Sequence, residues 1–108
     1  MPIYLNDWRN SGETGLLADF EIENLGGYEV VLASYTYEDY SGEAYVLLKK
    51  GGKLYEVHGG HCSCYGLEGQ FSPEEVDIHS IRHRVEKGTW GEEGKIKEYV
   101  LEALDELE

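Results

Sequence analysis

The sequence predicts an α+β fold in which an antiparallel β-meander of about four strands precedes two C-terminal helices packed on one face. Three observations predict it. Apolar residues alternate with polar ones in the first half of the chain, glycine pairs separate these segments, and the last third has helical periodicity. Strands followed by helices are typical of a sheet whose helices are segregated to one face.

Residues 2–15 are expected to form a short extended start followed by a loop rich in turn formers. The first long strand is predicted over residues 16–23, because an apolar residue recurs there at every second position. The apolar positions are Leu16, Ala18, Phe20 and Ile22, and the acids between and after them are Asp19, Glu21 and Glu23. Gly26 and Gly27 end this segment.

Three further strands are predicted over residues 28–37, 43–50 and 53–58. The strand over 28–37 is apolar or aromatic on both faces, which indicates a central position in the sheet. A turn is expected at 38–42, and Gly51-Gly52 is a two-residue hairpin signal.

The first helix is predicted to start at Ser72, with Pro73 in its first turn and Glu75 completing a capping box. It runs to about Glu86, and Phe71 would be its N-terminal hydrophobic staple. The second helix is predicted over residues 92–107. Its buried stripe is expected to comprise Ile96, Tyr99, Val100, Ala103, Leu104 and Leu107.

The 108 residues predict a single domain, 1–108, large enough to bury a modest core. The formal charge of −13 excludes direct binding to nucleic acid and to anionic membranes, which require clustered Lys and Arg. It favours a protein partner with a basic surface. No signal peptide or membrane span is visible, so a cytoplasmic protein is expected.

Acidic residues and tyrosines predict a partner-binding surface. Asp19, Glu21 and Glu23 would project from one strand face about 6.6 Å apart, and Glu98 and Glu102 would repeat on the last helix about 6 Å apart. Regular rows of carboxylates could imitate a nucleic-acid backbone and occupy a basic groove. The residues expected at this surface are Asp19, Glu21, Glu23, Tyr37, Glu38, Asp39, Tyr40 and Glu43.

Histidines and cysteines concentrate in one stretch, where His58, His61, Cys62 and Cys64 lie within seven residues. The two cysteines are too close for an unstrained disulfide and are expected to be reduced thiols. Zinc favours thiolate and imidazole ligands, so a zinc site is one alternative, although four ligands in seven residues rarely reach one tetrahedral centre. The sterically easier set is Cys62, Cys64, His79 and His83, with His58 and His61 as further candidates.

Two other hypotheses concern the same stretch. A thiolate activated by a nearby histidine would make the protein a cysteine-dependent enzyme, but the flanking acids Glu56 and Glu68 oppose thiolate formation. Alternatively, the glycines Gly59, Gly60, Gly66 and Gly69 permit a tight structural connector with no cofactor. In that case the cysteines behave as small apolar residues.

Three segments carry a resemblance to a known family. These segments are Tyr37-Glu-Asp-Tyr-Ser-Gly42, Gly52-Lys-Leu-Tyr-Glu-Val57 and His61-Cys-Ser-Cys-Tyr-Gly-Leu-Glu-Gly-Gln70. Together they resemble a family of small tailed-bacteriophage proteins to which no activity is assigned, over roughly residues 28–85. The resemblance implies a phage protein in a bacterial cytoplasm, and such proteins are often modulators of host enzymes, including anti-CRISPR and anti-restriction inhibitors.

The leading hypothesis is therefore a small acidic phage-type protein, without enzymatic activity or cofactor, that inhibits or modulates a host nucleic-acid-handling enzyme. A zinc-binding module is the first alternative, and a cysteine-dependent enzyme is the second. They differ in what they predict: binding through Glu38 and Asp39, a bound ion, or a reactive thiol.

Overall fold

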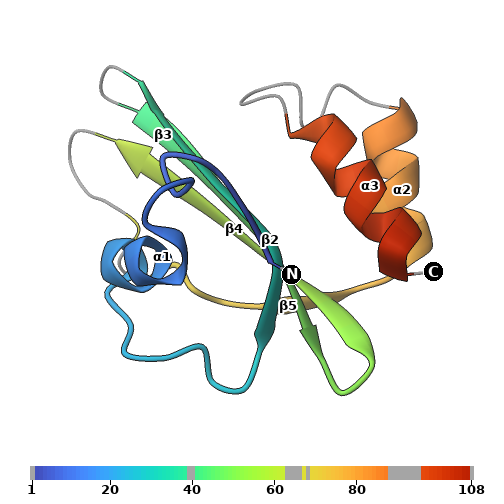
Figure 1. The fold of residues 1–108 in the computed structure, drawn as a ribbon, viewed down its shortest axis with the longest axis horizontal. Helices are drawn as coiled ribbons and strands as arrows, with labels where there is room; N and C mark the ends of the chain where they lie inside the picture. The colour runs from blue at the N-terminus through green and yellow to red at the C-terminus, as the bar shows by residue number, and fades with distance from the viewer. Residues whose placement is uncertain (1, 39–40, 63–66, 68, 88–95, 108) are drawn as a thin grey trace.

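The computed structural model of the chain describes residues 2–38, 41–62, 67, 69–87 and 96–107, and for Tyr37, Glu38, Ser41, His61 and Cys62 it describes the backbone only. Within these described residues, five strands and three helices form an α+β fold, as expected (Figure 1). In chain order they are β1 (Ile3–Asn6), α1 (Gly12–Phe20), β2 (Glu29–Glu38), β3 (Ser41–Lys50), β4 (Lys53–Cys62), β5 (Glu74–Val76), α2 (Ile78–Lys87) and α3 (Lys97–Leu107).

The strands form one sheet in the order β1-β2-β3-β4-β5. The β2-β3-β4 meander is antiparallel, and it is the part of the predicted sheet that the structure confirms. The sheet is mixed rather than antiparallel throughout, because β1 pairs parallel to β2 with Ile3 opposite Leu32. Strand β2 is flanked by β1 and β3, as its two apolar faces predicted.

The glycine hairpin signal is also confirmed. Gly51 and Gly52 join β3 to β4 with φ values of 59° and 79°, and Lys50 pairs with Lys53 across the turn. Two successive positive φ values define the turn whose twist matches that of the flanking strands. At the other end of β3, Glu38 pairs with Ser41, so the predicted turn at 38–42 narrows to residues 39–40, which lie outside the described residues.

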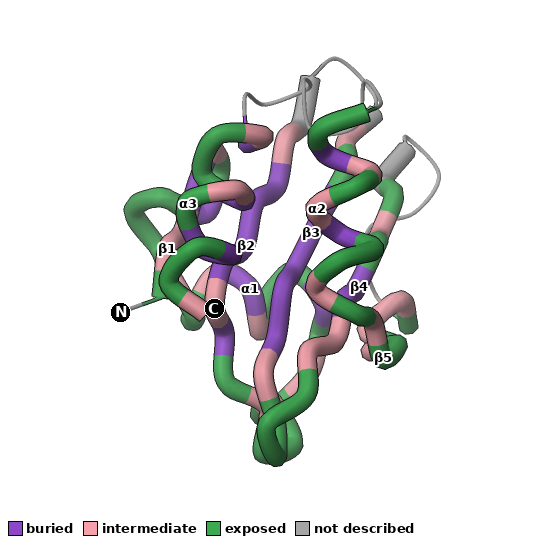
Figure 2. Tube along the Cα trace, turned by 90° about the vertical axis from the view of Figure 1, so that its right-hand side faces the viewer, coloured by how far each residue is buried: buried purple, intermediate pink, exposed green. Residues whose placement is uncertain are grey.

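The two predicted C-terminal helices lie together on one face of the sheet, but helix α1, which was not predicted, covers the other, so both faces are buried. Helix α1 lies on one side and the α2-α3 pair on the other (Figure 1). On β3 the alternation is strict: Ala44, Val46 and Leu48 join the core under α1, whereas Tyr45 and Leu47 join the core under α2 and α3. Figure 2 shows the resulting buried centre of β2 and β3 between exposed outer helix surfaces.

The strand predicted over residues 16–23 is wrong. Residues 12–20 form α1, which ends at Glu21 in the left-handed conformation. Leu16 and Phe20 are buried against Trp8, but Ala18, which a strand would bury beside them, is exposed. A spacing of four residues satisfies both periods, so Leu16 and Phe20 cannot discriminate a helix from a strand.

The capping box predicted at Ser72 is also wrong. Residues 74–76 form the edge strand β5 on β4, and the helix begins after Asp77, whose Oδ1 accepts a hydrogen bond from the His79 N–H at 3.3 Å. Phe71 stacks edge-on against Phe20 at a centroid distance of 5.3 Å, in the α1-side core. Phe71 is therefore not a helix staple. Residues 74–76 instead pair with the exposed backbone edge of β4.

Helix α3 has most of the predicted buried stripe, since Val100, Ala103 and Leu104 are buried and Ile96 is buried just before it. Tyr99 and Leu107 are the exceptions: 41% of Tyr99 is exposed, and Leu107 is only partly buried. The helix begins at Lys97, later than predicted, and residues 92–95 lie outside the described residues.

Candidate functional site

The acids predicted to form a row on one strand do not form one. Asp19 lies on α1, where its Oδ2 accepts a hydrogen bond from the indole N–H of buried Trp8 at 2.7 Å. Glu21 ends the helix with φ 56°, and Glu23 lies beyond it in an irregular segment. All three are exposed, but the spacing of about 6.6 Å requires a strand and is lost.

The other predicted partner-binding residues belong to the β2–β3 hairpin. Asp39 and Tyr40 lie outside the described residues, as do the side chains of Tyr37 and Glu38. Glu43 is exposed on β3, and its backbone carbonyl accepts a hydrogen bond from Thr36 Oγ1 at 3.4 Å.

The exposed side of α3 carries the other predicted acidic row. Glu98 and Glu102 are both exposed, and Glu106 continues the row one turn further. Residues four apart follow one another along a helix face at about 6 Å, so these three carboxylates form a ridge, and exposed Tyr99 lies beside it. We call Glu98, Tyr99, Glu102 and Glu106 the α3 ridge.

Within the described chain, the carboxylates of the α3 ridge lie in no ion pair. The neighbouring acid Asp105 differs, because Arg82 Nη2 donates to its Oδ1 at 3.1 Å and ties α2 to α3. The ridge thus presents negative charge that no described residue compensates, and this charge can attract a basic surface over several ångströms.

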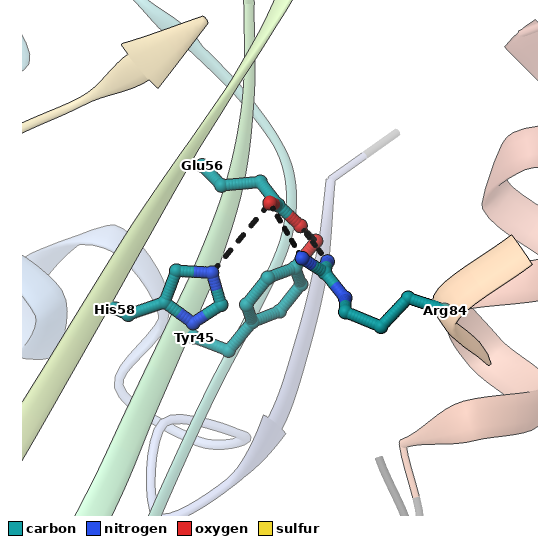
Figure 3. A network of polar contacts seen from close by, with 4 residues as sticks. All are labelled: Tyr45, Glu56, His58 and Arg84. Atoms are coloured by element: carbon teal, nitrogen blue, oxygen red, sulfur yellow. Dashed lines mark hydrogen bonds and ion pairs between the residues drawn. The ribbon is translucent and has the colours of Figure 1, made fainter. Parts of the chain in front are cut away.

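A buried polar network lies between the sheet and α2 (Figure 3). Glu56 on β4 is 5% exposed. Arg84 on α2 makes a two-pronged ion pair with it: Nη1 donates to Oε1 at 3.2 Å and Nη2 donates to Oε2. The Tyr45 hydroxyl donates to Oε2 at 2.5 Å, and His58 Nε2 lies 3.5 Å from Oε1.

Burial of Glu56 by itself opposes ionisation of its carboxyl. Hydrogen bonds from His58, Arg84 and Tyr45, together with the Arg84 charge, outweigh burial and lower the pKa of Glu56 to about 2. Burial and the adjacent Glu56 carboxylate raise the pKa of Tyr45 well above its ordinary value. Burial lowers the pKa of Arg84, but Glu56 raises it by more. The pair is therefore ionised at neutral pH.

Sequence reasoning missed this network because Glu56 was assigned only as an acid beside the His/Cys stretch. A signal was present: Glu56 occupies a core-facing position two residues after Leu54, in register with Leu47 of β3. A charged residue at such a position needs a partner of opposite charge. Chemically, the network locks α2 onto the sheet and leaves His58 at the surface with 52% of its side chain exposed.

Of the predicted zinc ligands, the structure describes the side chains of His58, His79 and His83, and all three are exposed. His79 and His83 are exposed on α2, whereas Leu67, three residues after Cys64, is buried on the opposite face in the α1-side core. Cys64 and the side chains of His61 and Cys62 lie outside the described residues. Among the residues described, no group of three or more His, Cys, Asp and Glu side chains could hold a metal ion.

The ends of the His/Cys stretch meet. Gln70 Nε2 donates to the Gly60 carbonyl at 2.8 Å, and the Gly60 N–H donates to Gln70 Oε1 at 2.8 Å. Leu67 fills the space beside Gly59, where a Cβ would lie 3.0 Å from Leu67 Cδ2. Gly60 and Gln70 are therefore held together, and Leu67 packs against Gly59.

Comparison of the chain with protein-family models, with curated proteins and with solved structures gives no match. In the described part of the chain, no helix is both long enough and apolar enough to cross a membrane.

Proposed function

We propose that this chain is a small acidic, phage-type protein that binds a basic surface on a host protein in the bacterial cytoplasm. Its target would be a nucleic-acid-handling defence enzyme, and its action would be of the anti-CRISPR or anti-restriction type. The observation that carries the proposal is the α3 ridge, in which three carboxylates without an ion-pair partner among the described residues follow one another along a helix that packs on the sheet.

The ridge supports a nucleic-acid mimic better than a diffuse acidic surface does. Its carboxylates repeat at fixed intervals, and a rigid row of charge loses little entropy when it enters a groove that binds phosphates. Tyr99 adds an aromatic side chain of the kind enriched at protein interfaces. Charge steers the encounter, and the aromatic contact contributes affinity once water is excluded.

The partner-binding surface in this proposal also includes Glu43 and the β2–β3 hairpin residues Tyr37, Glu38, Asp39 and Tyr40. Asp19 makes a smaller contribution, because its carboxylate is held by Trp8. Glu21 and Glu23 act through long-range charge only.

A test uses the purified chain as bait in lysate of a bacterial host at low salt. We expect a captured nucleic-acid-binding protein that is released by duplex DNA and by raised salt. The variant Glu98→Lys/Glu102→Lys/Glu106→Lys should lose this protein while its melting temperature stays near that of the wild type. The matched control Asp7→Lys/Glu13→Lys/Glu74→Lys makes the same charge change at exposed acids outside the proposed surface and should retain it.

Retention of the partner by the α3 ridge variant, or capture that duplex DNA does not compete with, would contradict the proposal. Binding lost equally in both variants would show that net charge, rather than the ridge, is recognised.

The second candidate is a zinc-binding module. The specific observation in its favour is the Gly60–Gln70 pairing, which brings together the two ends of the segment that contains Cys62 and Cys64. Its ligands would come from that segment rather than from His79 and His83, which are exposed on α2.

A further inference from the structure

A groove lies at one end of the layer between the sheet and the α2-α3 pair. Its walls are the β3–β4 hairpin, the β5–α2 connection and the C-terminal end of α3, and its volume is about 700 Å³. That volume falls within the range of ligand pockets, roughly 300–1,000 Å³. The lining residues are Lys49, Gly52, Lys53, Leu54, Glu75, Val76, Asp77, Ile78, Glu106 and Leu107.

The floor of the groove is apolar. Four aliphatic side chains line it, and each is only partly buried although it packs against the core under α2 and α3. These side chains are Leu54, Val76, Ile78 and Leu107. An apolar side chain from another molecule could therefore extend this core and remove the exposed aliphatic surface from water.

The charge of the rim indicates which residues of the other molecule should flank that apolar side chain. The charge of Lys53 is compensated by Glu75, whose Oε1 lies 3.2 Å from Lys53 Nζ. Lys49 Nζ lies 3.6 Å from Glu29 Oε2, and Glu29 does not line the groove. Asp77 and Glu106 have no Lys or Arg partner among the described residues. The rim is thus net negative, and it is complementary to cations.

The groove is continuous with the α3 ridge, because Glu106 is the last carboxylate of the ridge and also lines the groove. We propose that the groove receives an apolar side chain that lies between basic residues of the partner protein, while the neighbouring cations contact Glu106 and Asp77. This inference rests on the proposed function and adds the anchor residue of its interface: charge along the ridge gives steering, and the buried apolar side chain gives affinity.

The test uses two capped peptides as probes, Arg-Lys-Leu-Lys-Arg and Arg-Lys-Ser-Lys-Arg, titrated into ¹⁵N-labelled full-length protein at low salt. We expect the leucine peptide to bind at least about tenfold more tightly than the serine peptide, from burial of one leucine. Its chemical-shift changes should centre on Leu54, Val76, Ile78 and Leu107. Glu106→Gln should weaken its binding severalfold, whereas the matched variant Glu13→Gln, at an exposed acid on α1 outside the proposed interface, should change it less than twofold.

Equal affinity for both peptides, with shifts spread along α3, would overturn the groove and leave the acidic binding surface standing. Absence of binding by either peptide at low salt would overturn both the groove and the proposed attraction to basic partners.

Discussion

Gln70 pairs with Gly60 as a neighbouring strand residue would, although it does so through its side chain. Its carboxamide donates to the Gly60 carbonyl and accepts from the Gly60 N–H, both at 2.8 Å. The pairing continues the register of β5, in which Glu56 lies opposite Glu74, so that position 60 falls opposite position 70. One side chain therefore closes an edge of β4 that would otherwise offer free backbone groups to another chain.

We expect Gln70→Ala to accelerate hydrogen exchange of the Gly60 amide by at least about tenfold and to lower stability by about 1 kcal/mol, because two hydrogen bonds are lost. Gln70→Glu retains the acceptor but not the donor, and it should give an intermediate result. Exchange measured by NMR checks this prediction, and an unchanged Gly60 rate in Gln70→Ala would show that the clamp does not exist in solution.

The pKa of Glu56 predicts a specific acid sensitivity. Its folded-state pKa of about 2 is lower than its ordinary 4.5, so the unfolded chain binds the extra proton between these values. The contribution of Glu56 to stability is therefore complete above about pH 4.5 and is lost as the pH falls towards 2; its size is on the order of 3 kcal/mol. Denaturant unfolding of the wild type and Glu56→Gln at stepped pH measures it.

In Glu56→Gln, stability at pH 7 should fall by about 3 kcal/mol, because Arg84 keeps its charge without its carboxylate. The difference between variant and wild type should shrink as the pH drops from 4.5 to 2. Glu102→Gln, an exposed carboxylate on α3, is the control, and its difference should be near zero throughout. A pH-independent difference for Glu56→Gln would refute the lowered pKa.

Adjacent glycines on β4 should respond oppositely to alanine. At Gly59 a Cβ would lie 3.0 Å from Leu67 Cδ2 and 3.5 Å from Phe20, whereas at Gly60 nothing lies within 4 Å. Overpacking should make Gly59→Ala about 1–2 kcal/mol less stable than the wild type, while Gly60→Ala should be neutral or slightly stabilising. Equilibrium unfolding in urea distinguishes them, and equal effects would mean that Leu67 does not pack against β4.

Asp19 and Glu23 provide a matched pair for separating structure from binding. Asp19→Ala removes the acceptor of the Trp8 indole N–H and should cost about 1–2 kcal/mol, because a hydrogen bond to a charged group is lost and a buried donor remains. Glu23→Ala removes the same charge with little effect on stability. A thermal melt followed by circular dichroism checks both, and equal melting temperatures would contradict the role given to Asp19.

The zinc alternative can be tested independently of any partner. Because His79 and His83 lie on the face opposite to Leu67, we expect His79→Ala/His83→Ala to leave the metal content unchanged. Plasma mass spectrometry of untagged protein measures that content, and melting with chelator measures any coupling of metal to folding. Near-stoichiometric zinc that disappears in the double variant would overturn this placement.

The meander was predictable because its signals are local. The Gly51–Gly52 turn has one favoured conformation. Residues 28–37 are apolar on both faces, which indicates a strand inside the sheet rather than at its edge. Helix α3 was predictable for the same reason, apart from Tyr99, which is exposed although the helical period places it in the buried stripe.

The errors arose where tertiary structure decided between two local options. Leu16 and Phe20 fit the strand period and the helix period equally well. In the fold, residues 12–20 are helical, and both side chains pack against Trp8. Residues 72–75 match a capping box, but the free edge of β4 supplied strand hydrogen bonds. The Glu56–Arg84 pair joins residues 28 positions apart; strand alternation places Glu56 facing the core, but no local pattern identifies Arg84 as its partner.

The parallel pairing of β1 with β2 has a consequence for the order in which the chain assembles. Pairing of Ile3 with Leu32 closes a long loop, whereas the β3–β4 hairpin closes a turn of two glycines. Closing the longer loop costs more entropy, so we expect the meander to form first and the N-terminal segment to dock last. Residues 3–20 leave the ribosome before β2 and β3 do. The apolar side chains of Leu5, Leu16 and Phe20 are therefore exposed to water until their core partners have been synthesised. Residues 3–20 are therefore the part of this domain that we expect a chaperone or a protease to reach before it docks.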